Sequence, residues 1–455
     1  MTNNQITLIG AGLAGPLMAS FLAKQGFSVE IYERRSDMRK VKMSSGRSIN
    51  LALSARGIEA LKEVGVFKNI KPFIIPMSGR MIHDKSGLTN FQPYGQKKTE
   101  VIYSISRSML NMELMNLAEN MGGVSISFNH KLSAINLDKN ELEFEKKKVI
   151  FNKVFGCDGA GSILRDSIVN KTKTKFVQKP LGHGYKELNI PPSRFNKYQI
   201  NHNALHIWPR GQFMMIALPN LDKSFTVTLF MPLKGALSFD TIKTTKHIEN
   251  FFSTYFMDAI ELMPNLVEDF KNNPIGSLAT NYCDQWHYKD SAVIFGDAAH
   301  AIVPFFGQGM NASFQDCVVL NSLISKHQSD WSTIFNTFSS QHVKNGHAIA
   351  NMALENYVEM RDSVNDPLYL KRRELELSLE KKFPNKFIPR YSMVSFHQIS
   401  YDQVYNRGKF QFELMSDFLS KKITQHDLYN KIEISPYCIL DHTIFDEKRP
   451  LNIEE

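Results

Sequence analysis

The sequence predicts an α/β fold in which an antiparallel sheet is inserted into a Rossmann-like domain and a helical region follows. Three observations lead to this fold class. A strand, a glycine-rich turn and a helix open the chain. Apolar and polar residues alternate in strand-like runs between about residues 181 and 278, and the chain after about residue 326 is mostly helical in pattern. With 455 residues, the chain can form two or three domains with a large core.

The first strand covers residues 5–9 and is followed by the turn Gly10-Ala11-Gly12-Leu13-Ala14-Gly15. A helix over residues 16–25, a second strand over residues 28–32 and the acid Glu33 complete the pattern. The first glycine permits the tight turn, the second lets a pyrophosphate approach the backbone, and the third lets helix and strand pack closely. Glu33 would bind ribose hydroxyls and repel a 2′-phosphate, so the pattern predicts FAD or NAD here. The alternative is a chance glycine-rich turn.

A second acid–glycine turn, Gly156-Cys157-Asp158-Gly159-Ala160-Gly161-Ser162, follows an expected strand over residues 151–155. Its simpler interpretation is a tight strand-to-helix connection. A third turn, Gly296-Asp297-Ala298-Ala299-His300, follows an expected strand over residues 291–295 and leads to a helix from about Met310. Asp297 can accept hydrogen bonds from a ribityl or ribose hydroxyl. The peptide N–H groups of Gly309 to Asn311 can reach the electron-rich edge of a flavin ring. A purely structural turn is the alternative.

Between these turns the sequence predicts a polar loop, a helix and several strands. The expected elements are a loop over residues 43–50, a helix over 51–64, strands over 74–83 and 101–105, and a helix over 109–120 capped by Ser106, followed by strands over 124–128, 131–137 and 141–145. In the inserted region, expected strands over 204–208 and 213–218 flank a hairpin turn, and residues 225–231 alternate. Four residues there (Met214, Met215, Phe230 and Met231) could line an apolar pocket, although plain core is the safer interpretation.

Arg80 and a set of residues near position 356 could either face solvent or line a binding pocket. Arg80 lies within an expected strand, where an arginine is usually exposed. If it points into a pocket, its planar fork suits a carboxylate. Asn356, Glu359 and Met360 share one face of a long helix expected over residues 340–361, which would usually face solvent. Tyr94 alone is an ordinary turn tyrosine. No role follows from the polar tail after about residue 425.

Composition narrows the class of protein. The net charge of +9 comes from scattered lysines without interleaved aromatics, so a nucleic-acid partner is not expected. Four widely spaced cysteines (Cys157, Cys283, Cys317 and Cys438) form no CxxC pair, so neither a metal site nor a disulfide framework is indicated. The chain starts directly with a strand, which argues against a signal peptide, and no apolar run reaches the roughly 18–20 residues of a membrane span. A cytoplasmic protein is expected.

The three turns together resemble those of the single-component aromatic hydroxylases among the flavoprotein monooxygenases. Further segments narrow the resemblance to the kynurenine 3-monooxygenase family. They are Gly46-Arg47-Ser48-Ile49-Asn50-Leu51-Ala52-Leu53-Ser54, Arg80-Met81-Ile82-His83, Pro93-Tyr94-Gly95, Ser104-Ile105-Ser106-Arg107, Pro304-Phe305-Phe306-Gly307-Gln308-Gly309-Met310-Asn311 and Asn356-Tyr357-Val358-Glu359-Met360-Arg361. The resemblance implies a para-hydroxybenzoate-hydroxylase-like fold. Its FAD-binding domain would comprise residues 1–75, 100–180 and 275–325, with a substrate-binding sheet domain of residues 76–99 and 181–274 and a helical region of residues 326–455.

The resemblance also implies site residues. With the turns described above, the residues expected to contact FAD are Gly10, Gly12, Ala14, Gly15, Tyr32, Glu33, Arg34, Arg35, Ala52, Arg107, Leu132, Asp158, Asp297, Gly309, Met310 and Asn311. The residues expected to hold the substrate are Arg80, Tyr94, Asn356 and Tyr391 at its amino-acid end, Phe305 beside its ring, and Glu359 and Met360 next to the site. Family members often have a histidine where Phe306 stands. The eukaryotic members carry a C-terminal membrane anchor, and no such anchor is expected in this tail.

The implied activity is hydroxylation of L-kynurenine to 3-hydroxy-L-kynurenine, a step of tryptophan catabolism. FAD would be bound, while NADPH and O2 would be consumed through a flavin C4a-hydroperoxide. The substrate amine activates the ring, so no catalytic acid or base of the protein is expected, and NADPH would dock transiently. The alternatives are a flavin hydroxylase of another aromatic such as a hydroxybenzoate, an isoprenoid reductase, or a non-catalytic FAD-binding protein. A halogenase is disfavoured because Trp-x-Trp-x-Ile-Pro is missing from the sequence. A monomer or homodimer is expected.

Overall fold

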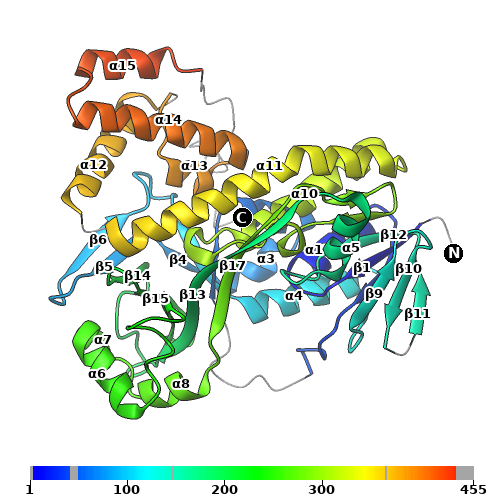
Figure 1. Ribbon diagram of the computed structural model, residues 1–455, viewed down its shortest axis with the longest axis horizontal. Helices are drawn as coiled ribbons and strands as arrows, with labels where there is room; N and C mark the ends of the chain where they lie inside the picture. Colours follow the sequence, from blue (N-terminus) through cyan, green and yellow to red (C-terminus); the bar gives the residue numbers. More distant parts are fainter. Residues whose placement is uncertain (1–3, 41–49, 146, 364–365, 385, 437–455) are drawn as a thin grey trace. The chain divides into compact units, whose positions relative to one another are not determined.

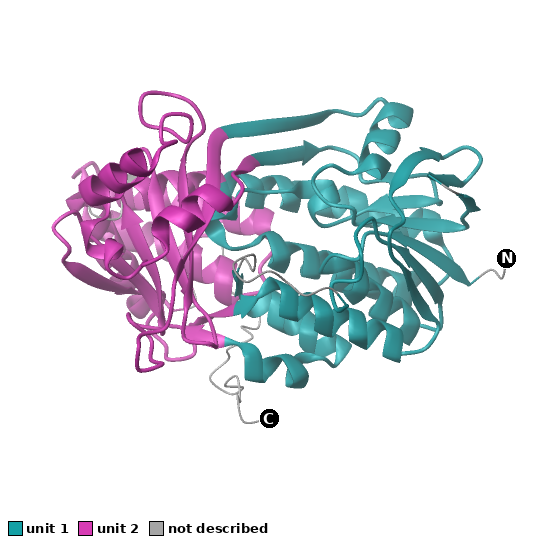
Figure 2. Ribbon diagram, turned by 90° about the horizontal axis from the view of Figure 1, so that it is seen from below, with its two compact units in different colours: residues 1–74, 105–181, 279–353 teal, residues 75–104, 182–278, 354–455 magenta. Residues whose placement is uncertain are grey.

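The computed structural model of the protein describes residues 4–40, 50–145, 147–363, 366–384 and 386–436. The chain divides into two compact units, each built from three separate segments (Figure 2). Unit 1 comprises Met1–Ile74, Ile105–Leu181 and Ala279–Ala353, and unit 2 comprises Ile75–Ser104, Gly182–Leu278 and Leu354–Glu455. Residues after 326 thus contribute to both units, and the three-domain organisation stays a prediction.

A six-stranded sheet in the order β18-β19-β12-β1-β2-β8 forms the centre of unit 1 (Figure 1). Its strands are β1 (Gln5–Ile9), β2 (Ser28–Tyr32), β8 (Val124–Ser127), β12 (Lys153–Gly156), β18 (His287–Tyr288) and β19 (Ala292–Ile294). Every neighbouring pair is parallel except β18 with β19. The expected Rossmann-like sheet is therefore confirmed. The turns after β1, β2, β12 and β19 all lie at its carboxyl edge, where such folds bind ligands.

A small antiparallel sheet, several helices and two further strands complete unit 1. The small sheet contains β9 (Leu132–Asn136), β10 (Glu141–Phe144) and β11 (Lys147–Ile150). The helices are α1 (Ala14–Lys24), α2 (Ala55–Val64), α3 (Phe67–Ile70), η1 (Lys71–Phe73), α4 (Arg107–Asn120), α5 (Ile163–Thr172), α9 (Asp297–His300), η2 (Pro304–Phe306) and α10 (Gly309–His327). The further strands are β3 (Asn50–Leu53) and the last two residues of β7 (Ile102–Ser106), whose first three residues belong to unit 2. Helix α1 packs against β2, α4 and α10, which places the first glycine turn in the centre of the unit.

Unit 2 contains most of a seven-stranded sheet in the order β17-β13-β16-β15-β14-β5-β6, in which part of β13 and part of β17 belong to unit 1. Its strands are β5 (Gly79–His83), β6 (Thr89–Pro93), β13 (Phe176–Ile190), β14 (Ala204–Pro209), β15 (Met214–Pro219), β16 (Phe225–Pro232) and β17 (Gly276–Cys283). The hairpin expected around Arg210 and Gly211 is present, because β14 and β15 pair antiparallel. Strand β5 pairs parallel with β14, with Arg80 opposite Leu205. The segment around Arg80 is thus built into the inserted sheet.

One face of this sheet carries a large apolar core. Three short helices, α6 (Thr245–Tyr255), α7 (Met257–Ile260) and α8 (Leu266–Asn272), contribute to it. The core includes Trp208, Met215 and Met231. The core interpretation of these two methionines is therefore correct. Met214 and Phe230 are buried as well, at 0% and 3% exposure.

The remaining helices follow the third turn. They are α11 (Trp331–Val358), which is the long yellow helix in Figure 1, the π-helical turn η3 (Glu359–Ser363), α12 (Pro367–Lys382), α13 (Arg390–Phe396), α14 (Tyr401–Leu419) and α15 (Gln425–Glu433). A small core that includes Leu379, Phe387 and Leu414 holds α12, α14 and α15 together. Within the described residues, no helix combines the length and hydropathy needed to cross a bilayer.

The structure corrects the helix expected over residues 51–64, because residues 50–53 form strand β3 and helix α2 begins at Ala55. The side chain of Asn311 explains the difference. Its amide nitrogen donates to the Ala52 carbonyl at 2.8 Å, and its oxygen accepts from the Ser54 N–H at 3.0 Å. These tertiary bonds favour extended backbone over local helical preference. Part of the polar loop expected over 43–50, with Gly46, Arg47, Ser48 and Ile49, lies outside the described residues.

Other boundaries also differ from expectation. The strand expected over residues 74–83 is interrupted at Ser78 and forms β4 (Ile75–Met77) and β5. Strand β4 pairs with β7 while β5 pairs with β14, so one extended segment serves two sheets. Strand β11 was missed because its lysines disfavour strand assignment, although it is an edge strand, where lysines are common. The helix expected over 340–361 begins at Trp331 and ends in a π-helical turn.

Candidate active site

The first glycine turn cannot carry side chains at its outer glycines. Gly10 has a φ of +107°, and a Cβ there would lie 2.6 Å from the carbonyl oxygen of Cys157. A Cβ on Gly15 would lie 2.0 Å from the Gly10 oxygen. By contrast, a Cβ on Gly12 would meet nothing within 4 Å. The outer glycines therefore serve close packing, and the middle one leaves the backbone open to a pyrophosphate, as the sequence predicts.

Glu33 follows β2 at the same edge of the sheet and is 5% exposed. Its Oε2 accepts from the Ala11 N–H at 2.8 Å, and its Oε1 accepts from the backbone N–H and Nε of Arg35 at 2.9 and 2.8 Å. Burial opposes ionisation, but these hydrogen bonds lower the pKa of Glu33. A carboxylate has about four acceptor positions. One position on Oε2 thus remains for a ribose hydroxyl, and the negative charge disfavours a 2′-phosphate.

Asp158 follows β12, beside the first turn. Its Oδ2 accepts from the Ile163 N–H at 2.9 Å. Its Oδ1 is buried and has no hydrogen-bond partner among the described residues. Burial raises the pKa of this carboxyl. A buried acceptor without a partner costs free energy in a folded protein, so a ligand hydroxyl at this position would be stabilising. The acid–glycine turn therefore fits a role beyond a tight connection.

The third turn presents Asp297 at the end of β19. Gly296 has a φ of +60°, a conformation that favours glycine, and the exposed Asp297 opens α9. Helix α10 begins at Gly309, and the first N–H groups of a helix have no acceptor within the helix. The N–H groups of Gly309 to Asn311 can thus donate to a ligand. The Asn311 side chain is already bonded to Ala52, Ser54 and Gly307, so its contact with a ligand would be through its backbone.

A buried ion pair fixes this third turn. The carboxylate of Asp316, in α10, accepts from the Gly296 N–H at 2.9 Å and lies 2.6 Å from Nε2 of His300. Its other oxygen lies 3.4 Å from Nδ1 of His342, in α11. Burial opposes both charges, yet the mutual attraction raises the pKa of His300 and lowers that of Asp316. Asp316 and His342 were not predicted from the sequence, because nothing in their spacing connects them with the turn.

The other residues expected at FAD differ in exposure. Tyr32 is buried and packs against Phe144, with ring centroids 4.6 Å apart, while Nζ of Lys147 lies 4.6 Å from its ring centroid. Leu132 is buried, Ala14 and Ala52 are partly exposed, Met310 is buried at the start of α10, and Arg34, Arg35 and Arg107 are exposed. All the residues expected at FAD thus lie in unit 1.

Six of the seven residues expected at the substrate lie in unit 2. They centre on Arg80, which is 7% exposed and not solvent-facing as strand arginines usually are. The Arg80 guanidinium carbon lies 5.0 Å from the ring centroid of Tyr391 and 5.9 Å from that of Tyr94. The two tyrosine rings stack, with centroids 4.9 Å apart and an angle of 8° between planes. The structure therefore brings together residues that lie far apart in the sequence.

The guanidinium of Arg80 is only partly engaged by the described residues. Its contact with Glu359 is long, at 3.5 Å. Burial alone would lower the Arg80 pKa, but the neighbouring tyrosines and Glu359 raise it, so the cation persists. Burial also raises the pKa of Tyr94 and Tyr391, which keeps both phenols neutral. The Tyr94 hydroxyl has no partner of ordinary hydrogen-bond geometry in the described part of the chain.

Helices near the end of unit 2 supply the rest of this cluster. Asn356 is buried, and its amide nitrogen lies 3.3 Å from the sulfur of Met360. On the helical face that these residues share with Glu359, Asn356 and Met360 are buried and Glu359 is half-buried. Glu359 opens the π-helical turn η3, and such turns are frequent at functional sites.

Two contributors were missed by the sequence analysis. The Tyr369 hydroxyl donates to Oε1 of Glu359 at 3.1 Å. The Arg373 guanidinium donates to the Tyr94 carbonyl at 2.7 Å and pairs with Glu376 at 3.0 Å. The spacing of Tyr369 and Arg373, four residues apart on one helix, was the only available signal. It does not point to a site by itself.

Phe305, the seventh expected substrate residue, lies in unit 1 together with Phe306. Both form the short 3₁₀ helix η2 between the third turn and α10, and each is 6% exposed. Gly307 follows with a φ of +66° and ends this helix. With Phe306 in place of a histidine, this segment offers an apolar surface next to the expected flavin turn.

Comparison with known proteins gives one family and many relatives. The family model of the FAD binding domain matches residues 3–333. The relatives named kynurenine 3-monooxygenase include that of Myxococcus xanthus, 44% identical over 90% of this chain and 90% of the relative. That of Stenotrophomonas maltophilia is 43% identical over 95% of this chain and 95% of the relative. That of Anopheles gambiae is 42% identical over 91% of this chain and 86% of the relative.

Solved structures with the same fold are more distant in sequence. The tetrameric form of 2-methyl-3-hydroxypyridine-5-carboxylic acid oxygenase matches with a TM-score of 0.66 at 18% identity, over 81% of this chain and 96% of that one. A variant of HpxO from Klebsiella pneumoniae in complex with FAD also gives 0.66, at 15% identity, over 83% and 96%. These matches concern the fold alone.

Proposed function

The chain belongs to the FAD-binding-domain family and, within it, to the kynurenine 3-monooxygenases, and from this premise we propose a role for each group of site residues. The protein is an FAD-dependent monooxygenase that uses NADPH and O2 to convert L-kynurenine to 3-hydroxy-L-kynurenine. The three turns of unit 1 would hold FAD, and the cluster around Arg80 in unit 2 would hold the amino-acid end of kynurenine. A cytoplasmic location and a monomer or homodimer are further parts of the proposal.

The residues of unit 1 fit FAD in three separate respects. Gly12 leaves the backbone open for the pyrophosphate, Glu33 has an acceptor position left for a ribose, and Asp158 has a buried oxygen with no partner in the described part of the chain. Asp297 would accept from the ribityl chain, and the N–H groups at the start of α10 would donate to the ring. When bound, FAD supplies the redox chemistry that takes electrons from NADPH and activates O2.

The cluster in unit 2 matches the polar end of kynurenine. Its carboxylate would receive hydrogen bonds from the Arg80 guanidinium and the hydroxyls of Tyr94 and Tyr391, which are neutral and can donate. Glu359 would move from its long contact with Arg80 toward the ammonium. The Asn356 amide supplies a further polar group at the buried end of its helix.

The task of these residues is positioning and the exclusion of water. The amino group of kynurenine makes the neighbouring ring carbon electron-rich, so the protein need not supply a strong base to assist attack there. Accordingly, the tyrosines beside Arg80 have raised pKa values and stay neutral, as suits donors that position and do not abstract protons. The buried Phe305 and Phe306 add apolar surface that disfavours water.

The observation that carries the proposal is the buried Arg80 cation, whose contact with a carboxylate of the described residues is long, at 3.5 Å. Replacing Arg80 with Ala should raise KM for L-kynurenine by about 100-fold, because a charge-assisted bidentate contact is lost. Arg80→Lys, which keeps the charge without the fork, should recover part of this loss. Arg194→Ala, at an exposed arginine of the same unit, serves as the control and should leave KM unchanged. An unchanged KM in Arg80→Ala with FAD still bound would refute the carboxylate assignment.

A further inference from the structure

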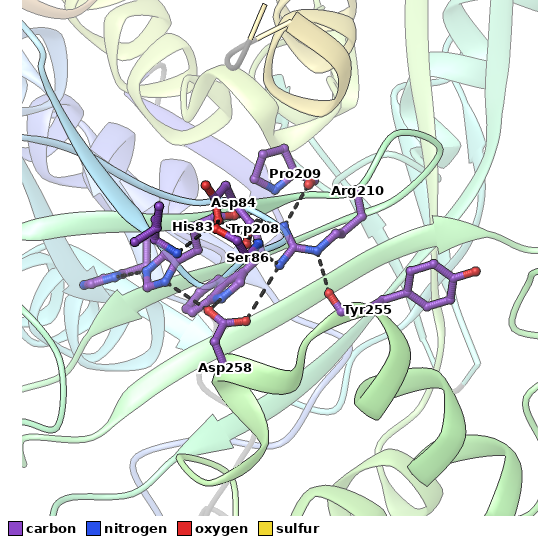
Figure 3. A network of polar contacts seen from close by, with 10 residues as sticks. His83, Asp84, Ser86, Trp208, Pro209, Arg210, Tyr255 and Asp258 are labelled. Carbon is purple, nitrogen blue, oxygen red and sulfur yellow. Dashed lines mark hydrogen bonds and ion pairs between the residues drawn. The ribbon is translucent and has the colours of Figure 1, made fainter.

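A second buried polar cluster lies in unit 2 on the opposite side of the strand that carries Arg80. Side chains alternate between the two faces of a strand, so in β5 Arg80 points to one face and His83 to the other. The His83 ring stacks on that of Trp208, with centroids 4.0 Å apart and an angle of 19° between planes. Trp208 belongs to the apolar core on that face. Figure 3 shows this cluster, for which the proposed substrate binding has no use.

Two hydrogen bonds and one ion-pair contact connect four groups through two imidazole rings. Nδ1 of His83 lies 3.3 Å from the carboxylate of Asp258, at the start of helix α7. Nε2 of His83 lies 2.8 Å from Nδ1 of His206, in the neighbouring strand β14. Nε2 of His206 lies 2.7 Å from the carbonyl oxygen of Asn201. A carboxylate at one end and a carbonyl at the other can both act only as acceptors.

The contacts along this chain determine how many protons the two imidazole rings carry. The contacts to Asp258 and Asn201 each require an N–H donor, and the contact between His83 and His206 requires one more. The chain therefore needs three ring protons when a ring N–H, and not a bare nitrogen, faces the Asp258 carboxylate. Two neutral imidazoles carry only two. In the fully bonded arrangement, the pair of histidines thus holds one extra proton and one positive charge.

The surroundings favour His83 as the holder of this proton. His83 faces the Asp258 carboxylate, whereas His206 faces a carbonyl and the other ring. Burial and the neighbouring His83 lower the pKa of His206 to about 4, although its bond to Asn201 works the other way. The contacts therefore assign one proton to His206, on Nε2, and one proton to each ring nitrogen of His83.

Asp258 has further partners that keep it ionised. The Trp208 indole N–H donates to it at 2.7 Å, and the Arg210 guanidinium lies 3.7 Å away. Burial alone would raise the Asp258 pKa, but the bonds from His83 and Trp208 and the nearby Arg210 lower it. The other charged group near Arg210 is Asp84, whose carboxylate is bound to local N–H and hydroxyl groups. The Asp258 carboxylate therefore faces two cationic side chains, His83 and Arg210.

The same cluster holds the backbone at the end of β5. The Arg210 guanidinium donates to the carbonyls of His83 at 2.9 Å and Asp84 at 3.1 Å. His83 is thus fixed through both its side chain and its backbone, three residues from Arg80. We infer that His83 is a positioning residue for Arg80, and that the ion pair between protonated His83 and Asp258 holds the end of β5 in place. This inference rests on the proposed role of Arg80 in binding kynurenine.

The protonation state is tested by nuclear magnetic resonance on protein labelled with ¹⁵N-histidine, with FAD bound. At neutral pH, both ring nitrogens of His83 should show the shifts of a protonated imidazolium. His206 should show one protonated Nε2 and one bare Nδ1. Assignment uses His83→Gln and His206→Gln. Two neutral rings would overturn the inference, whatever the kinetics.

The positioning role is tested with Asp258→Asn, which keeps the shape and can still accept from Trp208. The variant should lose the imidazolium signal and raise KM for L-kynurenine about fivefold, the effect of one weakened hydrogen bond, with kcat and FAD content unchanged. His83→Gln should do the same. The matched control is His202→Gln, at an exposed histidine stacked on Tyr198, which should change neither signal nor KM.

Failure of this inference can be distinguished from failure of the proposed function. If Arg80→Ala leaves KM unchanged, the substrate assignment fails even when His83 is protonated as described. If Arg80→Ala raises KM while Asp258→Asn and His83→Gln leave it unchanged, the positioning role of His83 is overturned and the substrate site stands. A fall in kcat alone in Asp258→Asn would also contradict positioning, because Arg80 would then hold the substrate normally.

Discussion

The replacement of Asp316 with Asn tests how unit 1 fixes its third turn. Asp316 is 3% exposed and serves Gly296 N–H, His300 and His342 at 2.9, 2.6 and 3.4 Å. The variant keeps the shape and one acceptor oxygen but leaves a buried imidazolium without its counter-ion. Breaking one partner of a buried ion pair costs about 3–5 kcal/mol. The loss should lower the Tm of unit 1 by roughly 6–20 °C, at about 2–4 °C per kcal/mol for a unit of this size.

The assay is thermal unfolding with and without added FAD, together with the dissociation constant of FAD. We expect weaker FAD binding as well, because Asp297 follows the Gly296 N–H that Asp316 holds. The control is Asp330→Asn. Asp330 is exposed and accepts a hydrogen bond from a backbone N–H in the first turn of a helix. Asparagine can accept the same bond, so the Tm should stay unchanged. A Tm and FAD affinity for Asp316→Asn equal to those of the control would refute the reasoning.

The ion pair also predicts a dependence on pH. The pKa of His300 is raised in the folded state, so its contribution is fully present below about pH 6.5, the usual histidine pKa, and is lost as pH rises through the folded-state value. The pKa of Asp316 is lowered, so its contribution is present above about pH 3.9 and is lost as pH falls through the folded-state value. The difference in stability between wild type and Asp316→Asn should therefore shrink above neutral pH.

Two further variants test one residue in each unit. Gly15→Ala places a Cβ 2.0 Å from a backbone oxygen, so the first turn must shift, and the purified protein should contain little FAD; full FAD content would contradict the packing role of Gly15. Tyr94→Phe removes one donor to the substrate carboxylate and should raise KM about tenfold with kcat nearly unchanged, whereas an unchanged KM would show that this hydroxyl does not meet the substrate.

The parallel sheet was predictable because its signals are local. The glycine turn, the helix and Glu33 lie within one short stretch, and the steric reasons for Gly10 and Gly15 hold in the structure. The hairpin at Arg210 was predictable for the same reason, since turn residues stand between two alternating runs. Both cases depend on contacts between residues that are close in the sequence.

Long-range contacts explain what the sequence could not reveal. The extended backbone at Ala52 depends on the side chain of Asn311, far along the chain. The burial of Arg80 depends on Tyr391, which lies far along the chain. The resemblance to a known family grouped these two residues, whereas the hydrophobic pattern of the sequence did not. Asp316 was missed because its partners are brought to it only by the fold. The chain of bonds from Asp258 to Asn201 was missed for the same reason.

The central claim is tested most directly by NADPH oxidation with the purified FAD-containing protein, with and without L-kynurenine, and by the mass of the product. The account predicts strong stimulation by L-kynurenine and a product heavier by one oxygen atom. Stimulation with hydrogen peroxide as the only product, or no stimulation while FAD is bound, would contradict it.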